Sequence, residues 1–171
     1  TLERFKARLV ARGFSQVYKE DYTDIFAPTI CINTLRTFFA IVAALNLECC
    51  QYNIKNAFIK AALQERIYFF APKEILVISG YSLRVLCSLY GLKQAAKDWN
   101  TLCKDHLITL NFKQSLADLC LFIYKDKKIT FLVYFYKNLR KRFNTKNLGE
   151  IKKILGMRIT RNRRTRKLFL D

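Results

Sequence analysis

Apolar residues recur at helical spacing in two long stretches of the chain. For the first stretch, Asn33 or Thr34 is the expected cap of a helix that runs to about Asn46. The apolar positions of this helix are expected to face the core, and they are Leu35, Phe38, Phe39, Val42 and Leu45. The second predicted helix covers residues 92–110. Its apolar stripe consists of Trp99, Leu102, Cys103, His106 and Leu110.

Shorter segments have the patterns of strands and turns. Residues 6–14 alternate basic and apolar side chains, which is typical of a strand with one cationic face. Further strands are predicted at 47–53, 67–70 and 84–87, and in two hairpins that join 120–124 to 129–135 and 157–160 to 167–170. Short helices are predicted at 54–63, 138–143 and 150–155. Helices interleaved with hairpin-connected strands indicate the α+β class rather than a parallel doubly wound sheet.

Positive charge is concentrated near the C-terminal end of the chain. The formal net charge is +18, and residues 127–171 supply +13 of it, from 15 Lys or Arg against two acids. A surface of this kind attracts phosphate backbones and releases their counterions. We therefore expect RNA or DNA as the partner, in preference to a basic face that is merely solvated.

The cysteines and the hydropathy pattern exclude several other classes of protein. The six cysteines form no C-x-x-C pair and the chain has one histidine, His106, so a zinc site is not expected. Reduced, mostly buried thiols and the lack of a visible signal peptide favour an intracellular location. The longest apolar run, residues 38–45, is too short to cross a membrane. Because the chain starts at Thr1, its ends are expected to be arbitrary cuts.

Five blocks of the sequence resemble, in order, the copia-type retrotransposon reverse transcriptases. They are KARLVARGFSQ (6–16), DYTDIFAP (21–28), QYNIKNAFI (51–59), SLYGLKQAAKDW (88–99) and NLGEIKKILGMRI (147–159). The resemblance implies a fingers-and-palm architecture, here truncated, with an antiparallel palm sheet and packed helices. It also implies one partial reverse-transcriptase domain over residues 1–171, without RNase H or integrase segments. The implied ancestry is an RNA-directed DNA polymerase that works on RNA/DNA hybrids.

The resemblance also shows which catalytic residues this chain lacks. The family has an Asp at the end of one strand and a Tyr-Val-Asp-Asp hairpin on the next, where this chain has Asn53 and then Tyr134-Phe135-Tyr136-Lys137. Tyr136 and Lys137 thus stand at or near the paired-Asp positions. A deletion of the motif and a gene model that skipped its segment remain open as explanations. In each case the sequence has no acid between Asp126 and Glu150.

Nucleotide addition in this family requires two Mg²⁺ ions, which bind carboxylates and substrate phosphates. Nearby acids do not replace the missing ones. Glu48 would lie on the opposite face of a strand shared with Asn53 because their offset is odd. Asp126 belongs to a hairpin turn, and Asp118 is interpreted as a loop or cap residue. Mg²⁺ is therefore expected for the family but not for this chain, and no catalytic residue is predicted to be intact.

The residues expected to bind nucleotides and nucleic acid follow from the same blocks. Lys6 and Arg8 match basic residues near the nucleotide triphosphate, with a solvated strand face as the alternative, and Ala96 replaces the family's Pro. The predicted nucleotide-binding residues are Lys6, Arg8, Tyr90, Gly91 and Gln94. The predicted phosphate contacts are Arg140, Lys141, Arg142, Arg161, Arg163 and Arg164.

Two hypotheses of different class remain. The first is a decayed reverse-transcriptase domain without polymerase activity. The second is a sequence-independent nucleic-acid-binding module that keeps the basic surface and performs no catalysis. The second predicts a steep fall of affinity with salt, because counterion release scales with the number of phosphate contacts.

Overall fold

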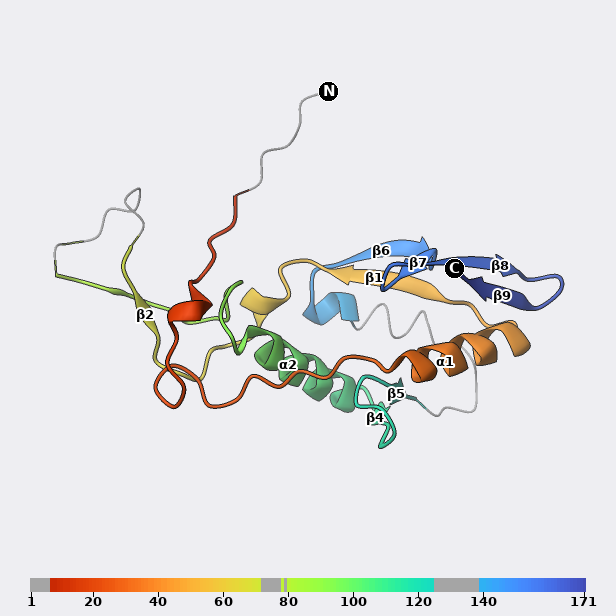
Figure 1. Ribbon diagram of the computed structural model, residues 1–171, viewed down its shortest axis with the longest axis horizontal. Helices are drawn as coiled ribbons and strands as arrows, with labels where there is room; N and C mark the ends of the chain where they lie inside the picture. Colours follow the sequence, from red (N-terminus) through yellow and green to blue (C-terminus); the bar gives the residue numbers. More distant parts are fainter. Residues whose placement is uncertain (1–6, 72–77, 79, 125–138) are drawn as a thin grey trace, which may run out of the picture. The chain divides into compact units, whose positions relative to one another are not determined.

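The computed structural model describes residues 7–71, 78, 80–124 and 139–171 (Figure 1). Contacts divide the chain into two compact units. The first unit comprises Thr1–Ala27 and Asn56–His106, and the second comprises Pro28–Lys55 and Leu107–Asp171.

The elements combine helices with small antiparallel sheets, which confirms the α+β class. They are the 3-10 helices Gly13–Ser15 and Phe58–Lys60, α1 (Ile32–Ala44), α2 (Ala95–Thr109), β1 (Cys50–Ile54), β2 (Tyr68–Phe69), β3 (Leu83–Arg84), β4 (Lys113–Gln114), β5 (Phe122–Ile123), β6 (Thr145–Glu150), β7 (Lys153–Ile154), β8 (Met157–Asn162) and β9 (Lys167–Leu170).

The first unit has its own apolar core beside a short antiparallel strand pair. β2 pairs with β3, which confirms the strand predicted at 67–70 at shorter length, whereas β3 overlaps the strand predicted at 84–87 only at Arg84. The start of α2 contributes to this core, because Ala95 is buried. The buried core residues are Leu63, Ile67, Val85, Leu92 and Ala95.

The strand predicted at 6–14 is wrong for the described part of that segment. Residues 7–10 are all exposed, and Val10 forms an isolated parallel bridge with Tyr90. The chain then turns into the 3-10 helix Gly13–Ser15. An alternating pattern produces a strand where one of its faces is buried, and none of residues 7–10 is buried here.

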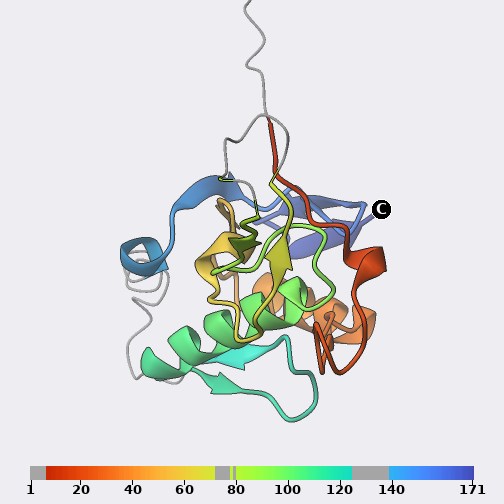
Figure 2. The same ribbon diagram turned by 90° about the vertical axis from the view of Figure 1, so that its left-hand side faces the viewer.

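The second unit is built from α1 packed on antiparallel strands (Figures 1 and 2). β1 pairs with β6, and β8 lies between β7 and β9 in a three-stranded sheet. The β8–β9 pair confirms the hairpin predicted at 157–160 and 167–170. The buried core residues of this unit are Leu35, Phe39, Val42, Cys49 and Ile159.

Helix α1 buries a narrower face than its sequence suggested. Leu35, Phe39 and Val42 are buried, whereas Phe38 is 40% exposed and Leu45 is 66% exposed. The three buried residues lie at i, i+4 and i+7, so they form one stripe against the sheet. Leu45 follows the last helical residue, at the C-cap. The expectation that all five apolar positions face the core was therefore wrong for Phe38 and Leu45.

Three other predicted elements differ from the structure because of local backbone geometry. In place of the helix predicted at 54–63, the structure has only the 3-10 helix Phe58–Lys60. The Lys55 amide donates to the Asn144 carbonyl, and Asn56 has a φ of 53°, which a helix does not allow. The predicted helix at 150–155 is wrong, because residues 153–154 are strand β7 and positive φ angles at Leu155 and Gly156 turn the chain into β8. Strand β5, in the segment 120–124, pairs with β4. Its predicted partner at 129–135 lies outside the described residues, as does residue 138, while 139–142 are helical as expected.

The N-terminus of α1 is capped by a residue far away in the sequence. The N-cap residue, Cys31, makes no side-chain capping bond, so neither Asn33 nor Thr34 is the cap. Instead the Cys31 amide donates to Asp118 Oδ2 at 2.9 Å, and the Cys120 amide donates to Asp118 Oδ1 at 2.8 Å. Asp118 is thus both a loop and a cap residue, as its position had suggested. The carboxylate joins α1 to the β4–β5 loop and compensates the positive end of the helix.

We expect this cap to make the stability of the second unit depend on pH. Hydrogen bonds from the amides of Cys31 and Cys120 and from the Thr34 hydroxyl hold the pKa of Asp118 below its usual value. A lowered folded-state pKa gives stabilisation that is complete above the unfolded pKa, about 3.9, and is lost as the pH falls through the folded value. We expect Asp118→Asn to lower the urea midpoint at pH 7 and to have a smaller effect at pH 3. An equal loss at both pH values would show that the charge of Asp118 is irrelevant.

Candidate functional site

Two of the family-like blocks meet in the first unit. The Ala11 amide donates to the Tyr90 carbonyl at 2.7 Å, so the segment before Gly13 lies against the segment around Gly91. Gly91 has a φ of +95°, and a Cβ added there would overlap the Ala11 carbonyl oxygen. A Cβ added at Gly13 would likewise overlap the Gly91 carbonyl oxygen. The two glycines therefore permit a backbone approach that a side chain would prevent.

Gln94, a predicted nucleotide-binding residue, is fully buried in this contact. Its Nε2 donates to the Asp21 carbonyl at 2.9 Å, and its Oε1 accepts from Gln16 Nε2 at 3.0 Å. Gln16 in turn accepts from the Lys93 amide at 2.8 Å. In this structure the Gln94 side chain joins the loop at 16–21 to the start of α2.

Lys93 and Tyr22 are parts of this site that the sequence did not single out. Lys93 Nζ donates to the Gln16 carbonyl at 3.1 Å and lies 4.8 Å from the centre of the Tyr22 ring, within the range of a cation–π contact. Both residues belong to the resembling blocks, which was the available signal. Tyr90 packs edge-to-face on Phe58, Arg8 is exposed, and Lys6 lies outside the described residues.

The first unit also contains a partly buried carboxyl group, that of Asp98. Asp98, in the first turn of α2, accepts a hydrogen bond from the hydroxyl of Ser88, which is fully buried. Burial raises the pKa of Asp98, and the Ser88 hydrogen bond opposes that change. The contact fastens α2 to residue 88, and one carboxyl group does not form a two-metal site.

Asn53, at the position of the family's first Asp, lies on strand β1. It is exposed, and its register partner on β6 is Lys146. Cross-strand partners have Cβ atoms roughly 5 Å apart, so Asn53 shares its face of the sheet with a lysine. The candidate positions of the second motif, Tyr136 and Lys137, lie outside the described residues, as does Asp126.

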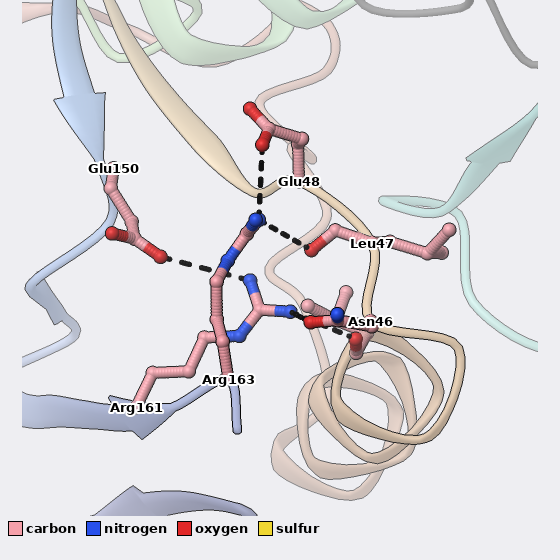
Figure 3. Close-up of polar contacts among 7 residues, drawn as sticks. Asn46, Leu47, Glu48, Glu150, Arg161 and Arg163 are labelled. Carbon is pink, nitrogen blue, oxygen red and sulfur yellow. Dashed lines mark hydrogen bonds and ion pairs between the residues drawn. The ribbon is translucent and has the colours of Figure 1, made fainter. Parts of the chain in front are cut away.

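The acids nearest to β1 in the sequence and in the sheet are paired with arginines of β8 and its turn (Figure 3). Glu48 lies 3.1 Å from Arg163 Nη2, and Glu150 lies 3.7 Å from Arg161 Nη1. Glu48 precedes β1 by two residues, so the expected strand parity between Glu48 and Asn53 does not apply. An Mg²⁺ site needs carboxylate oxygens, and each of these two carboxylates is paired with a guanidinium group in this structure.

The residues present therefore do not fit the paired magnesium ions of the family. Over the ranges 7–71, 78, 80–124 and 139–171, no group of three or more His, Cys, Asp or Glu side chains could hold a metal ion. Asn53 offers an amide oxygen in place of a carboxylate, and its register partner is a lysine, whose ammonium group has no lone pair for a metal. An uncharged amide beside a cation does not attract a dication.

The predicted phosphate-binding residues fall into two groups. Arg140, Lys141, Arg142 and Arg164 are exposed. By contrast, the side chain of Arg161 is 8% exposed and donates at 3.3 Å to both the Val42 carbonyl and Asn46 Oδ1 (Figure 3). Arg163 also donates to the Leu47 carbonyl at 3.4 Å. Arg161, near the end of β8, thus binds a carbonyl in the last turn of α1, where the helix dipole favours cations, and Arg163 binds a carbonyl just beyond the helix.

The cysteines are less buried than the sequence suggested. All six are free thiols, of which Cys49 is buried while Cys31 and Cys87 are exposed. Burial raises the pKa of the Cys49 thiol, so it remains protonated. The expectation of mostly buried thiols was wrong, because Cys31 lies at a helix end and Cys87 in the exposed segment after β3.

The comparisons define the class of protein. Residues 2–136 match the family model described as reverse transcriptase (RNA-dependent DNA polymerase), and the chain belongs to this family. Its relatives are copia-type retrotransposon polyproteins. The retrovirus-related Pol polyprotein from transposon TNT 1-94 of Nicotiana tabacum is 31% identical over 99% of the chain. Those from transposons RE1 and RE2 of Arabidopsis thaliana are 28% and 31% identical over 94% and 78% of it.

The match covers a small part of each relative. The chain spans 14%, 12% and 10% of the length of these three polyproteins. No solved structure matches the chain. None of the described helices is long and apolar enough to cross a membrane.

Proposed function

We propose that this chain is the fingers-and-palm part of a copia-type reverse transcriptase that has lost polymerase chemistry and retains nucleic-acid binding. The observation that carries the proposal is the pairing of Asn53 with Lys146 on β1 and β6. The family's first metal-binding Asp is replaced by a neutral amide, and a lysine lies across the strand from it. The sequence supplies no acid between Asp126 and Glu150 for the second motif.

The chemistry explains why this replacement is decisive. Polymerisation requires an attacking 3′-hydroxyl and a leaving pyrophosphate that are both held by metal ions. Lowering the charge of the donors and adding a cation both weaken binding of a dication. A single carboxylate cannot compensate for the loss of several, because the two metal ions share these carboxylates as ligands. We therefore assign no catalytic step to Asn53, Tyr136 or Lys137.

The two compact units divide most of the family-like blocks between them, and this division supports the proposal. The first contains the 6–16 and 88–99 blocks, which the resemblance links to the fingers and the nucleotide pocket, and residues 21–27 of the block between them. The second contains β1 with Asn53 and the segment 147–159, which it links to the palm. One partial domain over residues 1–171 stays a prediction.

Nucleic-acid binding is proposed on the basis of exposed positive charge. Arg140, Lys141 and Arg142 are exposed next to β6, and Arg164 is exposed in the β8–β9 turn. Cations that are not neutralised internally are available for phosphates. Arg161 is the poorest candidate among the predicted contacts, because its guanidinium is buried against α1.

We expect no primer extension by the purified chain on an RNA template with Mg²⁺ or Mn²⁺. Asn53→Asp should remain inactive as well, because one restored carboxylate cannot hold two metals. The measurement is incorporation of labelled nucleotide, with a copia-type enzyme that retains all three Asp residues as the positive control. Extension that rises in proportion to the amount of purified chain would refute the loss of catalysis. A gel shift on the same template-primer tests the binding half of the proposal separately.

A further inference from the structure

The outer face of the β7–β8–β9 sheet differs in composition from its inner face. Ile159 is buried, and Met157, Leu168 and Leu170 pack beside it on the inner face, in the core with α1. Alternate residues of β8 and β9 are exposed. The exposed residues on the strands of the sheet are Lys153, Arg158, Thr160, Asn162, Lys167 and Phe169.

Phe169 is a large aromatic side chain near the middle of this outer face. It is 53% exposed, and its register partner on β8 is Thr160. Residues two positions away along the chain and diagonally across β8 are polar: Lys167 on β9, Asp171 just after it, and Arg158 and Asn162 on β8. A small residue opposite the ring leaves its surface accessible, and apolar neighbours that could cover it are not among these positions.

The charges around the ring favour a polyanion. Lys153 is the register partner of Arg158, and Lys167 lies two residues from Phe169 on the same face. The one acid in the group is Asp171, whose backbone pairs with that of Arg158. Three cations against one acid around an exposed ring combine a stacking surface with phosphate-binding groups.

We infer that this outer face binds single-stranded nucleic acid, with one unpaired base stacked on Phe169 and its phosphates near Lys153, Arg158 and Lys167. The inference rests on the proposed nucleic-acid binding and assigns it to a surface outside the nucleotide pocket. Stacking needs a base whose face is free, which a duplex offers only at its ends. The surface should therefore prefer single strands over duplexes.

The test compares the unmodified chain with Phe169 variants in their binding to a labelled oligodeoxythymidylate. The probe has about 16 nucleotides, a length near the upper limit of single-strand site sizes. Fluorescence anisotropy of the full chain at low salt is expected to show that Phe169→Ala and Phe169→Leu each weaken binding by about tenfold. Phe169→Trp should retain it. The leucine variant separates loss of the aromatic face from loss of apolar volume, and circular dichroism checks that each variant is folded.

A matched control is Tyr68→Ala, since Tyr68 is 57% exposed on β2 of the first unit. Tyr68→Ala should change the affinity for the single strand by less than about twofold. The Phe169 variants should likewise change the affinity for a blunt-ended duplex of the same length by less than about twofold. The dissociation constant for the single strand should rise steeply with salt.

The outcomes separate this inference from the proposed function. If the unmodified chain binds both probes and Phe169→Leu leaves single-strand affinity unchanged, the stacking surface is refuted while nucleic-acid binding stands. If the chain binds neither probe at low salt, both fall. If Phe169→Leu instead dissociates a dimer seen by sedimentation, with no effect on oligonucleotide affinity, the face is a contact between two copies and the inference is refuted.

Discussion

Replacing Gly91 by alanine should destabilise the first unit by about 3 to 5 kcal/mol, combining backbone strain with steric overlap. The residue has a φ of +95°, and the new Cβ would overlap the Ala11 carbonyl oxygen and lie 2.9 Å from Val10 Cγ1. The Ala11–Tyr90 hydrogen bond of 2.7 Å fixes this approach, so the backbone cannot withdraw without breaking it. Urea unfolding followed by the fluorescence of Trp99 measures the loss.

Two other glycines of the same unit are controls for this prediction. Gly80 has a φ of +87° with no atom within 4 Å of an added Cβ, so Gly80→Ala carries the backbone strain alone and should cost about 1 kcal/mol. Gly13→Ala carries the overlap with the Gly91 carbonyl without a positive φ, so it should cost more than Gly80→Ala. If Gly91→Ala were no worse than Gly80→Ala, the close approach of the two segments would be wrong.

Replacing Gln94 by alanine should cost about 3 kcal/mol of stability, from an internal cavity and unpaired polar groups. The side chain is fully buried, and its removal orphans Gln16 Nε2 and the Asp21 carbonyl. A double-mutant cycle with Gln16→Ala should give a coupling of about 1 kcal/mol, because the two amides bond directly. Both free energies come from urea unfolding.

Gln64 provides the matched control for Gln94, because it is an exposed glutamine of the same unit. Gln64→Ala should change the stability by less than about 0.5 kcal/mol. Gln94 was predicted to bind nucleotide, and the measurement can separate the two roles. A Gln94→Ala chain with unchanged stability and weakened nucleotide affinity would support the binding role over the structural one.

The blocks of the sequence were informative about where contacts form, and less so about what each residue does. Residues 6–16 and 88–99 were singled out as parts of one site, and Ala11, Gly13, Gly91 and Gln94 do lie together. The function of Gln94 as a buried link could not be read from the chain, because burial depends on segments about 75 residues apart. Lys93 was missed for the same reason.

The arginines of the β8–β9 hairpin illustrate the same limit. Their charge was visible in the sequence, but Arg161 and Arg163 bind carbonyls near the end of α1, more than 110 residues away. Charge composition predicts affinity for phosphates only for those side chains that the fold leaves unpaired. Arg140, Lys141, Arg142 and Arg164 satisfy this condition by exposure.

By itself the sequence determined the α+β class, α2, the β8–β9 hairpin and the family, because local periodicity and ordered motifs are properties of neighbouring residues. It also determined that Asn53 stands where the family has an acid. Only the tertiary structure decided that Lys146 faces Asn53, that Asp118 caps α1 and that Phe169 stays uncovered. These facts depend on strand register and long-range packing, in which residues far apart in the sequence compete for the same partners, and no local pattern encodes the outcome of that competition.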